Sequence, residues 1–246
     1  LNKGLIYCSI SAFGQSGPRA SEGGFDLTMQ AMSGVMSVTG EPGGAPVKCG
    51  VPLCDFVAGL YGAFAISSAL ANRASTSEGQ RIDVSMLGTT LAVSALQTSE
   101  YFGTGRAPQK LGSAHPRNAP YQAFKAQDGY FGMAAGNNSL WHSVCDVVER
   151  PDLKDQDKYA NPTLRAQHQT ELRILLEEIF GRQPVDHWLS SFAKAGVPCS
   201  PINSFPEALS DPQVEAMGWI QELELPNGIK TRTFGPELRI NDQVQT

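Results

Sequence analysis

Residues 50–71, GVPLCDFVAGLYGAFAISSALA, constrain the fold most, because a tight loop that contains Pro52 runs directly into a long apolar segment rich in small residues. This pattern predicts a long helix. A single carboxylate, Asp55, lies at its start, where unpaired backbone N–H groups and the positive end of the helix dipole keep an acid ionised and oriented. Asp55 is therefore either a pre-positioned nucleophile or an ordinary N-cap, which is a common role for aspartate.

The same segment bears on whether the chain meets a membrane. Its apolar stretch 56–71 is interrupted by Ser67 and Ser68 and falls short of the roughly 20 residues that a membrane span needs. We therefore predict a buried helix and no membrane partner. Gly59, Ala63 and Ser67 recur every four residues, and their small size permits another backbone or a ligand to approach that face.

Charge and cysteine content exclude several classes of function. The 246 residues include 19 lysines and arginines against 24 acids, a net charge of -5, and no basic run that would neutralise a row of phosphates, so nucleic acid is not expected as a partner. The five cysteines have neither CxxC spacing nor a histidine at metal-ligand spacing, which predicts reduced thiols in the cytoplasm and no metal site. Cys54 adjoins Asp55, but its apolar neighbours and the lack of a nearby histidine argue against a nucleophilic thiol.

The first hundred residues predict strands and helices in turn. We expect strands at 4–10 and 80–86 and helices at 25–33 and 87–102. Asp26 should cap the helix at 25–33. The loop 40–46 matches no nucleotide-binding glycine pattern. The strand at 4–10 reads as buried, yet few strands follow that could surround it, so we expect the sequence to be a fragment that begins within a domain.

A stretch rich in Gly, Pro, Ser and basic residues, 103–118, predicts a linker and a domain boundary. After it, Asp128-Gly129 predicts a β-hairpin whose turn uses positive φ. Helices and short strands should follow, and together they indicate a small α+β unit. The expected elements are strands 121–126 and 130–135, helices 137–149, 162–180 and 185–195, a strand at 197–202, a helix opened by Asp211-Pro212, and a hairpin around Asn227-Gly228.

Several stretches, taken together, resemble the family III CoA-transferases, the CaiB/BaiF-like group whose superfamily also contains acyl-CoA racemases. Each stretch is weak by itself, but their order and spacing are specific, and they cover nearly the whole chain. The stretches are 9–18 (SISAFGQSGP), 24–34, 53–55, 79–86 (GQRIDVSM), 115–116, 120–121, 128–129, 135–137 and 195–203 (AGVPCSPIN).

The resemblance implies an α/β fold, with part of a Rossmann-like large domain and a smaller α+β domain. Residues 1–112 would be the central part of the large domain with its linker helices, 113–200 the small domain, and 201–246 a C-terminal segment that returns toward the large domain. It also implies a further N-terminal segment that handles the nucleotide, and an interlocked homodimer of the full-length protein. Without that segment, apolar surface around 5–10 should stay open for association.

The resemblance also implies that Asp55 is the catalytic residue. Attack of its carboxylate on an acyl-CoA thioester gives a mixed anhydride of comparable energy, so acyl transfer stays reversible. The CoA thiolate then forms an aspartyl-CoA thioester, and an incoming carboxylic acid repeats the steps in reverse. The substrates are thus a coenzyme A thioester and a carboxylic acid, with no bound cofactor. Small residues near Gly59 and Gly136 leave room for the water-excluding pocket that such intermediates require.

Two alternatives to CoA transfer stay open. A racemase of this superfamily passes protons between two opposed groups, an aspartate that matches Asp55 and a histidine at the position of Phe25 here. Phenylalanine cannot carry a proton, so we favour transfer. His115 lies far along the chain, and Asp26 is a rival carboxylate whose default role is capping. The third hypothesis is a non-catalytic fragment of such an enzyme.

Four further residues are candidates for substrate binding, namely Phe25, Gly136, Asn137 and Arg117. Asn137 follows Gly136 at a predicted helix start, so it either caps that helix or belongs to a loop over the acyl group. Arg117 either grips the free carboxylate of a dicarboxylic acyl group through a bidentate contact or is an exposed loop residue. The segment 115–118 stands where formyl-CoA transferases have a glycine run, which argues against oxalate as acceptor.

Overall fold

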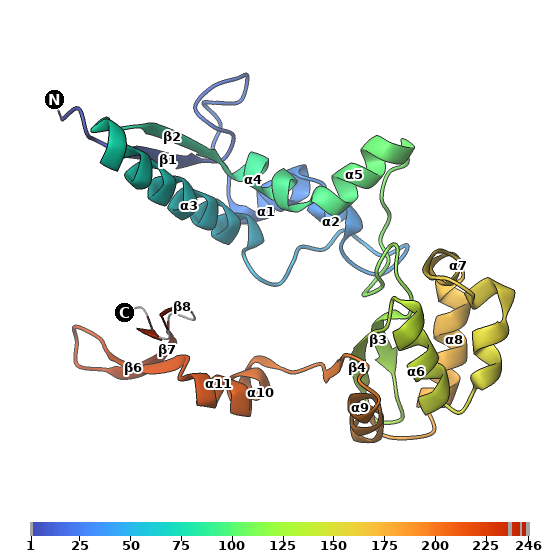
Figure 1. The fold of residues 1–246 in the computed structure, drawn as a ribbon. Helices are drawn as coiled ribbons and strands as arrows, with labels where there is room; N and C mark the ends of the chain where they lie inside the picture. Colours follow the sequence, from blue (N-terminus) through green and yellow to red (C-terminus); the bar gives the residue numbers. More distant parts are fainter. Residues whose placement is uncertain (1, 236–237, 242, 245–246) are drawn as a thin grey trace. The chain divides into compact units, whose positions relative to one another are not determined.

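The computed structural model describes residues 2–235, 238–241 and 243–244. The chain forms two compact units, Leu1–Pro116 and Arg117–Thr246, which we call unit 1 and unit 2. The division falls inside the glycine- and proline-rich stretch 103–118. Figure 1 shows the elements of each unit.

Two parallel strands and a long helix organise unit 1. β1 (Tyr7–Ser11) pairs with β2 (Arg81–Ser85) in a register that runs from Tyr7↔Arg81 to Ser11↔Ser85. Parallel strands require a crossover connection. α3 (Leu53–Thr76) is the main element of that crossover, and it lies along both strands (Figure 1). This parallel strand–helix–strand arrangement confirms the predicted α/β class.

The first strand is confirmed, but its predicted burial is wrong for the part of the chain that the structure describes. β1 begins at Tyr7, and the side chains of Tyr7 and Ile10 stay 56% and 51% exposed. The physical reason is that β2 is its one paired neighbour among the described residues. Leu5, just before the strand, is 58% exposed, so the expected apolar surface around 5–10 is present.

The central helix is longer and more exposed than the sequence predicts. α3 has 24 residues and is long and apolar enough, by length and composition, to cross a membrane, a criterion that a single core helix of a soluble protein also meets. The prediction that it is too short for a span is therefore wrong. The prediction of burial is also wrong, because Phe56, Leu60 and Phe64 are 66%, 69% and 74% exposed. The strands of unit 1 cover one face only.

The strands approach small residues of α3 other than Gly59, Ala63 and Ser67. Ala58 and Gly62 are buried, and a Cβ atom at Gly62 would lie 3.2 Å from Ile10 Cδ1. Gly59 and Ala63 are exposed, and a Cβ atom at Gly59 would meet nothing within 4 Å. The core of unit 1 is accordingly small. Its buried members are Ala12, Met29, Cys54, Ala58, Val84 and Met86.

Four shorter helices complete unit 1. They are α1 (Asp26–Met32), α2 (Val35–Val38), α4 (Met86–Val93) and α5 (Ala95–Thr104). The single helix predicted at 87–102 is in fact two, because the chain leaves helical geometry at Ser94. There the Ser94 hydroxyl donates to the carbonyl of Thr90 at 2.8 Å, and its N–H is shared between Thr90 and Leu91. Such back-bonding competes with the regular ladder.

Unit 2 contains a three-stranded antiparallel sheet in the order β3-β4-β5. Its strands are β3 (Tyr121–Lys125), β4 (Tyr130–Ala134) and β5 (Cys199–Pro201). The predicted hairpin is confirmed, but its turn differs, because four residues connect the strands and Gly129 is not among the glycines with positive φ. Asp128 instead bonds to the start of a helix, where its Oδ1 accepts the N–H of Val185 at 2.8 Å.

Helices pack on this sheet around a continuous apolar core. They are α6 (Asn138–Val147), the 3-10 turns η1 (Pro151–Asp155) and η2 (Asp157–Tyr159), α7 (Pro162–Gln167), α8 (Gln169–Phe180) and α9 (Val185–Lys194). The helix predicted at 162–180 breaks at His168 into α7 and α8. Phe124, Phe131, Phe180 and Phe192 are buried together in this core, with Trp188 against them.

Further elements follow β5 in unit 2. These are α10 (Phe205–Leu209), α11 (Pro212–Met217), β6 (Ile220–Glu224), β7 (Lys230–Phe234), β8 (Arg239–Ile240) and β9 (Gln243–Val244). Two predictions are confirmed here. Asp211 caps α11, accepting the Gln213 N–H at 2.8 Å, and β6 and β7 pair across Asn227-Gly228, with Gly228 at φ 80°.

Candidate active site

Asp55 is the third residue of α3 and projects from its exposed side. Pro52 occupies the N-cap position, so the interpretation of Asp55 as the N-cap is wrong. The side chain is exposed and lines a hollow of about 400 Å³ together with Pro52, Phe56, Gly59 and Leu60. This carboxylate therefore lies in the first turn, where the helix dipole favours a negative charge, beside a space as large as many ligand pockets.

The backbone N–H groups at the start of α3 are used unequally. The N–H of Leu53 donates to the carbonyl of Val51 at 2.8 Å, and that of Phe56 to the carbonyl of Pro52 at 3.2 Å. The N–H of Cys54 donates to Asp26 Oδ1 at 2.9 Å. The N–H of Asp55 has no hydrogen-bond partner among residues 2–235. One backbone donor is thus left over at the residue whose carboxylate faces the hollow.

Asp26 does not cap its own helix, and the prediction that it does is wrong. Phe25 is the N-cap of α1, and its N–H donates to Thr28 Oγ1 at 2.9 Å. The Asp26 carboxylate, which accepts the Cys54 N–H at Oδ1, also accepts a hydrogen bond at Oδ2 from Gln30 Nε2, at 2.8 Å. Asp26 therefore caps the first turn of α3 from a separate helix, 28 residues earlier in the chain.

Cys54 is fully buried between these groups. Burial raises the pKa of its thiol above the ordinary value, the nearby Asp26 and Asp55 carboxylates raise it further, and a hydrogen bond with Thr90 opposes the shift. A neutral, enclosed thiol is a poor nucleophile. This environment agrees with the argument from the sequence against Cys54 as a nucleophile.

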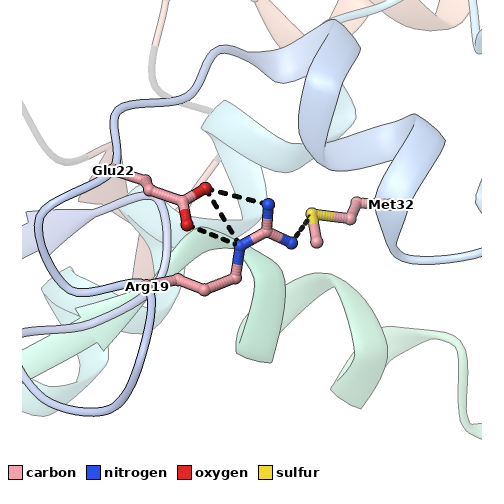
Figure 2. A network of polar contacts seen from close by, with 3 residues as sticks. All are labelled: Arg19, Glu22 and Met32. Atoms are coloured by element: carbon pink, nitrogen blue, oxygen red, sulfur yellow. Dashed lines mark hydrogen bonds and ion pairs between the residues drawn. The ribbon is translucent and has the colours of Figure 1, made fainter.

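Phe25 is 82% exposed, and the loop before it is held by a second polar network. Figure 2 shows the Arg19 guanidinium between the Glu22 carboxylate and the sulfur of Met32. Its Nη2 lies 2.8 Å from Glu22 Oε2, and its Nη1 donates to Met32 Sδ at 3.3 Å. The same guanidinium lies 4.7 Å from the ring centre of Phe13. This network ties the loop ahead of Phe25 to the end of α1.

The remaining predicted residues lie in unit 2. Asn137 caps α6, because its Oδ1 accepts the Leu140 N–H at 2.8 Å, and this is one of the two roles predicted for it. Gly136 is packed tightly, since a Cβ atom there would lie 2.8 Å from Asn118 Cβ. Arg117 is exposed. Asp55 and Phe25 thus belong to one unit, and Gly136, Asn137 and Arg117 to the other.

Arg165, which was not predicted from the sequence, stabilises the Gly136-Asn137 turn by hydrogen bonds to residues 136 and 138. Its side chain is fully buried and donates to the carbonyls of Ala119 at 2.8 Å, Tyr159 at 2.9 Å and Gly136 at 3.3 Å, and to Asn138 Oδ1 at 3.0 Å. Burial lowers the pKa of the guanidinium. No pattern in the sequence marks this residue, because all its partners except Tyr159 lie 27 or more positions away.

No group of three or more His, Cys, Asp or Glu side chains that could hold a metal ion occurs within the described ranges.

Comparison with known proteins identifies the family. Residues 1–245 match the family model described as CoA-transferase family III. The chain belongs to CoA-transferase family III. It is 39% identical over 228 residues to the succinate–glutarate CoA-transferase of Agrobacterium fabrum, covering 93% of this chain and 57% of that protein. It is also 39% identical to the acetyl-CoA:oxalate CoA-transferase of Acetobacter aceti, covering 88% of this chain and 56% of that protein.

The fold of this family III chain is also that of solved structures. A CAIB/BAIF family protein from Brucella suis superposes with a TM-score of 0.80 at 37% identity, covering 99% of this chain and 63% of that one. The family assignment and the α/β class that the resemblance implies are therefore confirmed. The chain spans a little over half the length of the curated relatives that it matches.

Proposed function

We propose that the full-length protein, meaning this chain with whatever precedes and follows it in its gene, transfers CoA between carboxylic acids with Asp55 as the nucleophile. Family membership supports the reaction. The observation that carries the residue assignment is the position of Asp55, an exposed first-turn carboxylate beside a hollow of about 400 Å³ that does not cap α3.

In the proposed mechanism the Asp55 carboxylate forms two kinds of covalent intermediate, a mixed anhydride and a thioester. Asp55 attacks the thioester carbonyl carbon, the C–S bond breaks, and a mixed anhydride and CoA thiolate result. The thiolate attacks the aspartyl carbonyl carbon, which releases the donor acid and leaves an aspartyl-CoA thioester. The acceptor carboxylate attacks that thioester, and the thiolate then takes the acceptor acyl group and regenerates Asp55. The unused N–H of Asp55 is a donor suited to the oxyanions that form at this residue.

Dicarboxylic acids are the proposed acceptors and donors. Relatives named for succinate, glutarate and oxalate support this class. Arg117 is proposed to bind the distal carboxylate, since its guanidinium offers a bidentate fork, and Asn137 with Gly136 to lie in a loop over the acyl group. We also propose that the full-length protein forms an interlocked homodimer. Light scattering on the full-length protein measures its oligomeric state.

Trapping of the acylated residue tests the assignment. During turnover of succinyl-CoA with glutarate, hydroxylamine should convert Asp55 to its hydroxamate, which peptide mass spectrometry locates. D55N should lose at least about 1,000-fold in kcat/KM, because an amide cannot form either intermediate. Glu78→Gln is the matched control, since Glu78 is an exposed acid just beyond the other end of α3.

An unlabelled Asp55 together with undiminished turnover in D55N would reject the role. Deuterium uptake at the α-carbon of a 2-methylacyl-CoA in heavy water would favour the racemase alternative instead. A screen of mono- and dicarboxylic acids, with oxalate as one arm, then defines the acid pair.

A further inference from the structure

Two hydrogen bonds tie α1 to the segment that enters α3, and a third joins the two side chains of α1 that make them. Gln30 is fully buried on α1, and its Oε1 accepts the N–H of Cys49 at 2.8 Å. Its Nε2 donates to Asp26 Oδ2 at 2.8 Å, and Asp26 Oδ1 accepts the N–H of Cys54 at 2.9 Å. The two side chains thus hold both ends of the segment 49–54, which stops one residue before Asp55.

The backbone N–H groups at the two ends of this hydrogen-bonded series determine which side-chain atoms must be acceptors. Cys49 and Cys54 each present a backbone N–H, which can only donate. The side-chain atoms facing them must therefore both be acceptors. The bond between residues 26 and 30 in turn needs one donor and one acceptor. A carboxylate paired with an amide satisfies all three bonds, whereas two amides or two carboxylates leave one contact between like groups.

We propose that Asp26 and Gln30 are positioning residues for Asp55, which fix the direction of its carboxylate through the backbone of residues 49–54. This inference rests on the proposed function of Asp55. Asp26 acts by accepting hydrogen bonds, and neither it nor Gln30 exchanges a proton with the substrate. Since a misplacement of about 1 Å can cost about 100-fold in rate, a shift of this segment should affect turnover more than substrate binding.

A charge swap in the full-length protein tests the proposal. D26N and Q30E should each lower kcat about 100-fold, with the KM for succinyl-CoA changed less than about 3-fold, because each creates one contact between like groups. The double variant D26N/Q30E restores an acceptor at both ends and a donor-to-acceptor bond in the middle. It should recover kcat to within about 10-fold of the wild type. Gln109→Glu, the same chemical change at an exposed residue of unit 1, is the control.

The swap separates positioning from direct chemistry. A double variant as impaired as D26N would overturn the proposal, since an Asp26 that touches the substrate cannot be replaced by a glutamate at position 30. Single variants with wild-type kcat would overturn it as well. Q30A keeps the bond from Cys54 to Asp26, so it is the milder variant to use where D26N does not fold, and it should lose about 10-fold in kcat; an unchanged kcat would contradict positioning.

Hydroxylamine labelling of the wild type distinguishes this proposal from the one on which it rests. No hydroxamate at Asp55 in the wild type means that the proposed function has failed. A labelled Asp55, with the same labelling rate in D26N, Q30E and Q30A as in the wild type, means that the positioning role alone has failed.

Discussion

The two units bury very different amounts of apolar surface. Nineteen buried hydrophobic residues form one core in unit 2, whereas the core around α3 in unit 1 has six. Phe180 in unit 2 is fully buried, while Phe64 on α3 is 74% exposed. Because buried apolar area is a main source of stability, the comparison teaches that the unit with the proposed nucleophile has the smaller stabilising core among the described residues.

In each unit a charged side chain, the half-buried Asp26 in unit 1 and the fully buried Arg165 in unit 2, organises a turn by hydrogen bonding to backbone atoms. In unit 1 the Asp26 carboxylate accepts the Cys54 N–H at the start of α3. In unit 2 the Arg165 guanidinium donates to three backbone carbonyls around the start of α6. The charges are opposite because helix starts offer donors and the turn around Gly136 offers acceptors.

The largest expected effect is the loss of a core ring. Phe180→Ala in the 246-residue chain should destabilise unit 2 by about 3–5 kcal/mol. Four rings surround Phe180 with centroids 5.0 to 5.9 Å away, so the space cannot close. Urea unfolding followed by tryptophan fluorescence measures this, because all three tryptophans, Trp141, Trp188 and Trp219, lie in unit 2.

Phe64→Ala is the matched change in unit 1. It should alter the free energy of unfolding of the same chain by less than about 0.5 kcal/mol. Urea unfolding monitored by circular dichroism measures this change. Equal costs for the two substitutions would break the comparison. A much larger cost in the full-length protein than in this chain would sharpen it, by showing that the exposed side of α3 is covered there.

A smaller effect is expected from Arg165→Lys. One ammonium group cannot serve four acceptors spread over Ala119, Gly136, Asn138 and Tyr159, so about 1.5–3 kcal/mol of stability should be lost. Tryptophan fluorescence in urea again measures the change. Arg182→Lys, at an exposed position of the same unit, should be neutral. Equal values for both substitutions would mean that the buried guanidinium contributes nothing beyond its charge.

The last expected effect concerns pH. Burial raises the pKa of the Cys145 thiol from 9.0 to about 12. The unfolded chain therefore ionises this thiol first, so stability is fully present below pH 9 and falls by about 1.4 kcal/mol per pH unit between pH 9 and 12. Comparing urea unfolding at pH 8 and pH 10 should show this loss in the wild type, and a smaller loss in Cys145→Ala. Identical losses in both proteins would contradict the assignment.

Some local features could be predicted from the sequence, whereas contacts between residues far apart in the chain could not. The caps at Asn137 and Asp211 and the Asn227-Gly228 turn could be predicted, because the hydrogen-bond partners that define each lie within three residues. The Asp128-Gly129 hairpin is present, but the positive φ predicted for its turn is not, and the Asp128 side chain bonds instead to Val185, 57 residues away. Propensity alone could not anticipate the helix breaks at Ser94 and His168.

The candidate site shows the same limit. Asp55 could be singled out because a carboxylate at the start of a long apolar helix is visible in the sequence. The partner of Asp26 could not, since Cys54 comes near only in the fold. One contact of Gln30 has a signal in the sequence. Its four-residue spacing from Asp26 on a short helix favours a side-chain hydrogen bond between them. The other end of Gln30, bonded to Cys49, had no such signal.

The fixed direction of the bonds through Asp26 and Gln30 restricts how these two positions can evolve. A lineage that loses the acid at one of them must pass through a poorly bonded intermediate before gaining an acid at the other. Natural sequences with an intact segment before α3 should therefore carry an acid and an amide at this pair, in either order.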